Sequence, residues 1–263
     1  MRDPREGVAA DGTIVTGADA AHLDVAFAPV VDDAVSRLRA EVGASLHGIY
    51  LYGSVATGQA VVARSDLDLI VVLRTTVDAA LGDVAAEVGR RHRDVVRGVA
   101  VGTVTFEDFW RPDPAAAADR CFLRHYTVYL AGEDLRPTLP ACRPSTELAV
   151  GFNGDLGAVL ADVRRRLETT TDPAARAALE VRVCRKLLMA AATLLSVETG
   201  GWSTDRATGA ALVARVAPAL RASAEAALRR SEEGAGLADE DELLRLVDGL
   251  GAWLVDRYRA AGS

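Results

Sequence analysis

The chain has no run of about 18 consecutive apolar residues, which is the length that a helix needs to cross a bilayer. Its N-terminus also lacks a basic stretch followed by an apolar core, the pattern of a signal peptide. These two absences lead us to expect a cytoplasmic protein without a membrane partner.

Cysteine is scarce, with three residues in 263. Cys121, Cys142 and Cys184 do not have the spacing of a metal-ligand motif, and an odd number cannot be fully paired in disulfides. We therefore expect reduced, structural cysteines, which again favours the cytoplasm.

Positive charge is also in deficit. The chain has 30 Lys and Arg against 37 Asp and Glu, which gives a net charge of −7. A protein that binds nucleic acid needs a basic surface to neutralise phosphates, so this balance argues against nucleic acid as a partner.

The remaining composition is that of a globular protein, with 50% hydrophobic and 25% charged residues. Residues 1–20 are polar and without periodicity, which predicts a flexible tail. Residues 135–144 contain three prolines and predict a linker. We therefore expect an α/β domain over 21–140 and an all-helical domain over 145–263.

The periodicity of apolar residues predicts the elements of each domain. In the first domain it predicts helices at 21–42, 77–92 and 119–131, and strands at 48–52, 67–73 and 95–106. This order fits a small α/β domain with a mixed sheet. In the second domain it predicts only helices, at 146–169, 173–199, 204–217, 219–232 and 239–261, which indicates a helical bundle.

The most informative segment joins the first two predicted strands. Gly53 and Ser54 follow the first strand, and Asp66 and Asp68 stand at the start of the second. Because residues two apart on a strand point to the same face, the two carboxylates should be neighbours. Like charges on an apolar strand repel each other and lose hydration, which a Mg²⁺ ion would relieve. Gly53 permits a sharp turn close to a ligand, and Ser54 offers a hydroxyl and an N–H to a phosphate.

This pattern resembles the signature of the nucleotidyltransferase superfamily of the polymerase-beta type, in which Gly-Ser and a loop precede Asp-x-Asp on an apolar strand. The alternative is a solvated strand end beside a glycine turn. The resemblance implies that Asp66 and Asp68 are catalytic and hold Mg²⁺, while Gly53 and Ser54 grip the phosphates of a nucleoside triphosphate.

The domain order resembles one branch of that superfamily, the aminoglycoside adenylyltransferases that modify streptomycin and spectinomycin. Residues 129–135 and 187–206 add to this likeness. It implies ATP as the co-substrate and a hydroxyl of a small molecule as the acceptor. An aminoglycoside is a polycation, which suits the negative net charge, and Glu180, Glu198 and Asp205 are candidate contacts for it.

The chain departs from the superfamily in one respect. A third carboxylate usually stands on the strand after Asp-x-Asp, near the position of Ala100, but residues 99–105 contain no acidic residue. Asp94 precedes this strand and is our candidate for the third catalytic residue, whereas Glu107 and Asp108 after it fit a loop or cap. Otherwise the third carboxylate comes from elsewhere, two suffice, or the enzyme is weak.

Arg182, Arg185 and Lys186 are candidates for nucleotide binding. Their i,i+3 and i,i+4 spacing places them on one helix face, and guanidinium groups suit phosphates. The alternative is a solvated face in an arginine-rich protein.

The resemblance thus predicts a Mg²⁺-dependent enzyme that transfers AMP, or another nucleotide, to a small molecule and releases pyrophosphate. Two alternatives remain open: an antitoxin-type adenylyltransferase that modifies a protein or RNA, and a nucleotide-binding module without turnover. A monomer and a homodimer are both compatible with the sequence.

Overall fold

The computed structural model describes residues 3–232 and 240–262, and its chain divides into two compact units. Unit 1 is Asp3–Arg143 and unit 2 begins at Pro144. Unit 1 contains a mixed four-stranded sheet with helices, and the described part of unit 2 is helical, so the predicted fold class is confirmed. None of the described helices is long and apolar enough to cross a bilayer.

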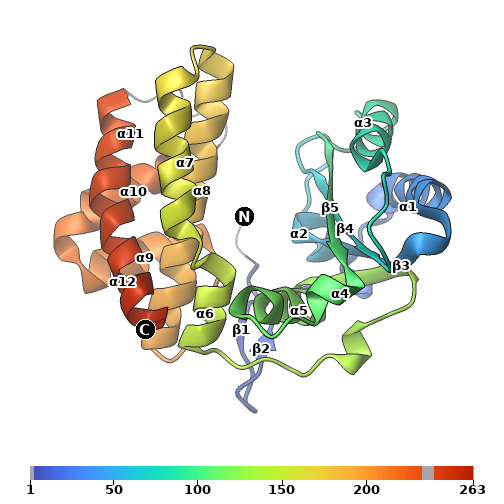
Figure 1. The fold of residues 1–263 in the computed structure, drawn as a ribbon, viewed down its shortest axis with the longest axis horizontal. Helices are drawn as coiled ribbons and strands as arrows, with labels where there is room; N and C mark the ends of the chain where they lie inside the picture. Colours follow the sequence, from blue (N-terminus) through green and yellow to red (C-terminus); the bar gives the residue numbers. More distant parts are fainter. Residues whose placement is uncertain (1–2, 233–239, 263) are drawn as a thin grey trace. The chain divides into compact units, whose positions relative to one another are not determined.

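The sheet of unit 1 has the strand order β5-β4-β3-β6, and Figure 1 labels three of these strands, β3, β4 and β5. Its strands are β3 (Leu46–Tyr52), β4 (Leu67–Leu73), β5 (Val99–Thr105) and β6 (Val128–Gly132). β4 runs antiparallel to β3 and parallel to β5, and β6 runs antiparallel to β3. The parallel pair is joined through a helix, α3 (Leu81–Arg91), which is the usual connection for parallel strands.

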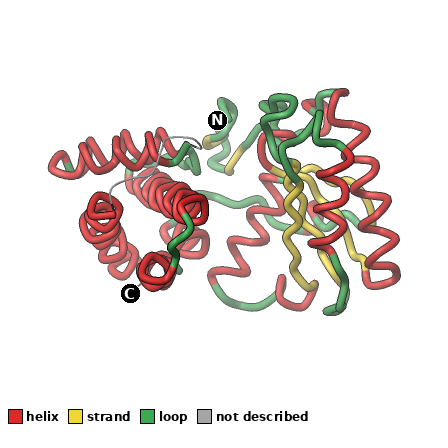
Figure 2. Tube along the Cα trace, turned by 90° about the horizontal axis from the view of Figure 1, so that it is seen from above, coloured by secondary structure: helices red, strands yellow, loops and turns green. Residues whose placement is uncertain are grey.

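Helices cover both faces of this sheet, as Figures 1 and 2 show. They are α1 (Ala28–Val42) and α3 (Leu81–Arg91) on one face, and α4 (Phe106–Phe109) and α5 (Pro114–Tyr126) on the other. Leu69 and Val71 of β4 are buried with the first pair, and Val72 is buried with the second. Because β4 is buried on both faces, its sequence is almost wholly apolar, and Asp68 is its single charged residue.

Residues 119–131 form the end of a helix and a strand, where the sequence predicts one helix. α5 ends at Tyr126, Thr127 is extended with φ −122° and ψ 155°, and β6 then pairs with β3. The buried residues Val128 and Ala131 are three positions apart, a spacing that fits a helix. The prediction was wrong here because pairing with a strand that is distant in sequence decides the conformation.

Residues 3–20, for which the sequence predicts a flexible tail, contain a short two-stranded sheet. β1 (Gly7–Val8) pairs antiparallel with β2 (Ile14–Val15). Ile14 is buried, and its N–H donates to the carbonyl of Cys142 at 2.8 Å. The partner lies more than a hundred residues away in the sequence, so no local pattern signals this contact.

Unit 2 is built around one long helix, α8. The helices described in this unit are α6 (Thr146–Asn153), α7 (Leu156–Thr169), α8 (Pro173–Glu198), α9 (Arg206–Val216), α10 (Arg221–Arg230), α11 (Glu240–Leu246) and α12 (Ala252–Gly262). α6, α7, α9, α10 and α12 all pack against α8. A helix surrounded in this way is apolar on most sides, which explains the alanine and leucine in its C-terminal half.

The helix boundaries in unit 2 follow local signals. The predicted helix 146–169 is interrupted after Asn153, where Gly154 follows. Asp205 caps α9 and accepts the Thr208 N–H at 2.7 Å. The predicted helix 239–261 begins outside the described residues, and from Glu240 it consists of α11, a π-helical turn at 247–251, and α12.

Candidate active site

The β3–β4 ladder brings the glycine turn and the carboxylates together. Tyr52, the last residue of β3, pairs with Asp68 of β4. Gly53 then turns with φ +73°, a conformation that favours glycine. A Cβ atom on Gly53 would lie only 2.6 Å from Asp68 Oδ2. Glycine therefore meets two requirements here, the turn itself and room for the Asp68 carboxylate.

Asp66 and Asp68 form a pair of interacting acids on either side of the buried Leu67. The pKa of Asp68 is raised to about 6, first because the carboxyl is largely buried and second because of the charge of Asp66. The charged form of Asp68 is thus disfavoured in the protein alone. A bound divalent cation supplies the compensating charge, so two hard oxygen ligands in this setting fit Mg²⁺.

Arg97 is a residue of this site that the sequence analysis missed. Its Nε donates to Asp66 Oδ1 at 3.0 Å, and a second guanidinium N–H donates to Asp66 Oδ2. The charge of Arg97 also lowers the pKa of Asp68, although burial outweighs it. The parallel register explains the contact, because Leu67 pairs with Val99 and the residues just before both strands meet. The register of β4 and β5 would have predicted this contact, but the sequence alone does not give that register.

The third carboxylate of the superfamily is missing from β5. The register pairs Asp68 with Ala100, the residue near which the sequence analysis expected that carboxylate. Glu107 and Asp108 follow the opposite end of β5 in α4, and Asp108 accepts a hydrogen bond from the Thr105 hydroxyl at 2.7 Å. The strand separates them from Ala100 by roughly 15 to 20 Å.

Asp94, predicted as the third catalytic residue, lies exposed in the turn between α3 and β5. Within the described part of unit 1 its carboxylate has no hydrogen bond or ion pair, and Arg97 is the residue of this turn that contacts Asp66. Among residues 3–143, no further Asp, Glu, His or Cys completes a compact ligand group with the Asp66–Asp68 pair. A catalytic role for Asp94 stays a prediction.

Ser54 is the second residue of α2 (Gly53–Ala56) and is half-buried. The hydroxyl of Thr57 lies within hydrogen-bond distance of the carbonyls of Gly53 and Ser54, at 3.2 and 3.3 Å, which closes the turn. Within the described part of unit 1 the Ser54 hydroxyl itself has no partner. It is therefore available to a ligand, and its role in phosphate binding stays a prediction.

Arg182, Arg185 and Lys186 line a cavity of about 730 Å³ within unit 2, between α7 and α8. Lys186 Nζ pairs with Asp155 Oδ1 at 2.7 Å, and Arg185 Nε donates to the carbonyl of Ser231 at 2.9 Å. Arg182 is exposed and has no ion pair in the described part of unit 2. The three cations thus share the wall of a concave site, and their role in nucleotide binding stays a prediction.

The three acids considered for a cationic acceptor have structural partners in unit 2. Glu180 is buried and pairs with Arg230 at 2.7 Å, and Glu198 pairs with Arg257 at 2.5 Å. Asp205 is the cap of α9. These contacts account for the three acids without an acceptor.

The segment that contains the carboxylate site matches a known family. Residues 33–121 match the nucleotidyltransferase domain family, and this range includes Gly53, Ser54, Asp66 and Asp68. The chain therefore contains a nucleotidyltransferase domain of the polymerase-beta type, which indicates a transferase. Members of this family typically use a nucleoside triphosphate and a divalent metal ion.

The fold is also similar to that of a solved spectinomycin adenyltransferase from Enterococcus faecialis, crystallised with ATP and spectinomycin. The two chains are 16% identical with a TM-score of 0.54, and the match covers 88% of this chain and 98% of that one. At this identity the likeness shows the fold alone. No curated protein sequence matches the chain.

Proposed function

We propose that the protein transfers AMP, or another nucleoside monophosphate, from a nucleoside triphosphate to a hydroxyl of a small molecule and releases pyrophosphate. The observation that carries this proposal is the Asp66–Asp68 pair beside the turn at Gly53, inside a nucleotidyltransferase domain. The reaction is an in-line attack of the acceptor hydroxyl on the α-phosphorus. Its catalysis consists mainly of positioning the reactants and neutralising charge.

Asp66 and Asp68 would hold the Mg²⁺ ion. When bound, the ion neutralises triphosphate oxygens and lowers the pKa of the acceptor hydroxyl. Gly53 leaves room for the Asp68 carboxylate and for close approach of a phosphate, and the Ser54 hydroxyl donates to a phosphate oxygen. Arg97 donates two hydrogen bonds to the Asp66 carboxylate, and a bound cation would compete with Arg97 for those oxygens.

Arg182, Arg185 and Lys186 are proposed to bind the phosphates of the nucleotide. The cavity they line supports this, because its lining combines apolar side chains with the three cations and one acid, Asp155. An aminoglycoside is the first acceptor class to test. The net charge of −7 suits a polycation, and the fold is that of an enzyme solved with spectinomycin.

A second candidate function is a nucleotide-binding module without turnover. The observation that favours it is Ala100, which occupies the position opposite Asp68 where the superfamily usually carries a carboxylate. Such a module would bind a Mg²⁺–triphosphate complex and form no pyrophosphate with any acceptor.

The test is pyrophosphate release with Mg²⁺, each of the four ribonucleoside triphosphates and a panel of aminoglycosides. The proposal expects release that needs one acceptor and that falls to background in Asp66→Asn and Asp68→Asn. Asp256→Asn is the matched control and should retain full activity, because Asp256 is an exposed acid of α12 that pairs with Arg259 of the same helix. Retained turnover in either site variant would refute the proposal.

Two further outcomes separate the alternatives. Labelled nucleotide on a protein or RNA band would indicate a macromolecular acceptor. Calorimetric binding of the Mg²⁺–triphosphate complex without any pyrophosphate would indicate the binding module.

A further inference from the structure

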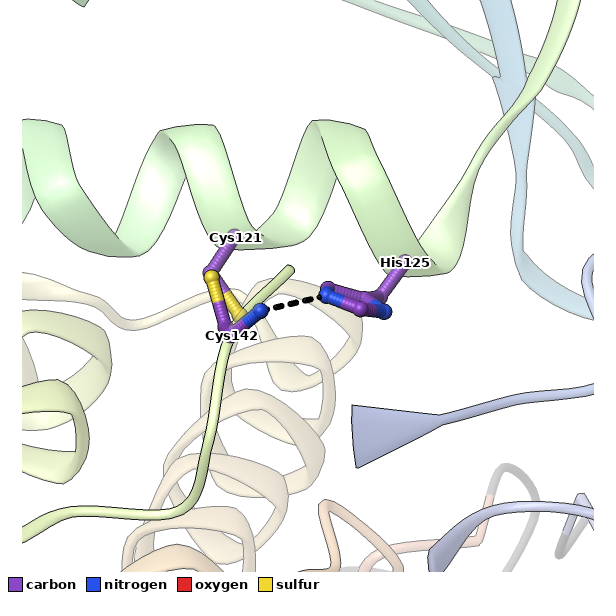
Figure 3. Close-up of side chains that lie close together, drawn as sticks. All are labelled: Cys121, His125 and Cys142. Atoms are coloured by element: carbon purple, nitrogen blue, oxygen red, sulfur yellow. Dashed lines mark hydrogen bonds between the residues drawn. The ribbon is translucent and has the colours of Figure 1, made fainter. Parts of the chain in front are cut away.

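A second group of potential metal ligands lies on α5, and the sequence analysis missed it. Cys121 and His125 are four residues apart and therefore share one face of the helix. Cys142 meets them from the extended segment that precedes α6 (Figure 3). The two Sγ atoms and a ring nitrogen of His125 all lie within 4.8 Å of one another. The sequence spacing of the cysteines does not reveal this approach, because 20 residues lie between Cys121 and Cys142.

The backbone holds Cys142 in this place. Its N–H donates to His125 Nε2 at 2.9 Å, and its carbonyl accepts the Ile14 N–H at 2.8 Å. Cys121 is fully buried, whereas His125 and Cys142 are half-buried. The three side chains are thus gathered by the fold itself, and the half-buried side of the group leaves a path for an ion.

We propose that Cys121, His125 and Cys142 bind one zinc-class transition-metal ion. Two sulfurs and an imidazole are the ligands that such borderline ions prefer, and they discriminate against Mg²⁺ and Ca²⁺. The site shares no residue with the Asp66–Asp68 pair and is independent of the proposed transfer reaction. Its place in the fold fastens the segment before Pro144, together with β2, to α5.

Metal binding releases thiol protons to the solvent. The metal binds as a dication and forms two metal–sulfur bonds. Each cysteine that carries a thiol proton releases it to the solvent. The two thiolates then neutralise the charge of the metal. The lone pair of His125 Nε2 accepts the Cys142 N–H in the metal-free protein and would bind the metal instead. One hydrogen bond is thus exchanged for a metal–nitrogen bond. A water molecule takes the fourth position of a tetrahedral ion.

The experiment is a titration of the reduced, tag-free full-length protein with Co²⁺, a spectroscopic substitute for Zn²⁺. The expected result is one Co²⁺ per chain, with a thiolate-to-cobalt band in the near ultraviolet and tetrahedral bands in the visible. Zn²⁺ should displace Co²⁺ and remove both. Cys121→Ser, Cys142→Ser and His125→Gln should each weaken binding by about tenfold or more. Cys184→Ser, which removes the third cysteine, buried in α8, is the matched control and should bind normally.

A second measurement on the wild-type chain does not depend on the variants folding. Zn²⁺ should protect Cys121 and Cys142 from alkylation, as read by peptide mass spectrometry, and leave the alkylation of Cys184 unchanged. Co²⁺ binding without the thiolate band, or equal binding by Cys142→Ser, would overturn the proposal. So would a chain that is isolated with a Cys121–Cys142 disulfide and that binds no metal after reduction.

Discussion

At the scale of single residues, the turn at Gly53 brings the backbone after β3 close to the Asp68 carboxylate. We predict that Gly53→Ala destabilises the protein by about 1 to 2 kcal/mol, because an L-residue is strained at a φ of +73°. The new Cβ would also displace the Asp68 carboxylate, whose Oδ2 lies 2.6 Å from its position, so transfer activity should fall. Urea unfolding and pyrophosphate release measure the two effects.

Gly82→Ala is the matched control for this substitution. A Cβ at Gly82, in the first turn of α3, meets no atom within 4 Å. The stability of this variant should stay the same or rise by up to about 1 kcal/mol. If Gly53→Ala behaves like Gly82→Ala in both assays, the turn does not constrain the carboxylate site.

Asp68 gives a second prediction at this scale, and its sign follows from the pKa. The folded protein raises the pKa of this carboxyl from 3.8 to about 6, so folding is penalised where Asp68 is charged. The penalty is absent below about pH 4, grows as the pH rises from about 4 to 6, and is complete above that. Asp68→Asn should therefore stabilise the metal-free protein at pH 7.5 by up to about 3 kcal/mol, and the gain should vanish near pH 4.

Urea unfolding in the presence of a chelator checks this at both pH values. Asp256→Asn should change stability by less than about 0.5 kcal/mol at either pH, because Asp256 is exposed. A loss of stability in Asp68→Asn at pH 7.5 would mean that the charged Asp68 carboxylate does not destabilise the metal-free protein.

At the scale of elements, local sequence predicted what local forces determine. The apolar sequences of β3 and β4 predicted both strands, and the i,i+2 spacing of Asp66 and Asp68 predicted that the two carboxylates are neighbours. The sequence did not predict β6 or the contact of Arg97 with Asp66, because both depend on strand pairing and register. The approach of Cys142 to α5 is a tertiary contact of the same kind. What the sequence could not supply was thus the partner of each element.

The buried ion pair between α8 and α10 carries a prediction about unit 2. The side chain of Glu180 is 5% exposed and that of its partner Arg230 is 18% exposed. Glu180→Ala would leave a largely buried guanidinium without this partner, so we expect a loss of about 3 to 5 kcal/mol. Asp256→Ala removes a pair whose side chains are 75% and 76% exposed, and it should cost less than about 0.5 kcal/mol. Equal effects in urea unfolding would contradict the structural role of the α8–α10 pair.

At the scale of the whole molecule, the proposed function places the metal ligands in unit 1 and phosphate-binding cations in unit 2. Arg182 is the clearest test of unit 2, because it lines the cavity and has no ion pair in the described part of that unit. Arg182→Ala should raise the KM for the nucleoside triphosphate about tenfold and change kcat less, since it removes binding rather than chemistry. Arg165→Ala, an exposed arginine of α7 paired with Asp162, should leave both constants unchanged. Unchanged kinetics in Arg182→Ala would remove this residue from the nucleotide site.

In the proposed function, Asp66 and Asp68 support nucleotidyl transfer to a small molecule. The most direct measurement follows label from the α-phosphate of the nucleoside triphosphate into the acceptor, in wild type and in Asp68→Asn. Label is expected on the small molecule in the wild-type reaction with Mg²⁺, and none is expected with the variant or with chelator. Label that still reaches the acceptor in Asp68→Asn would contradict the proposed function.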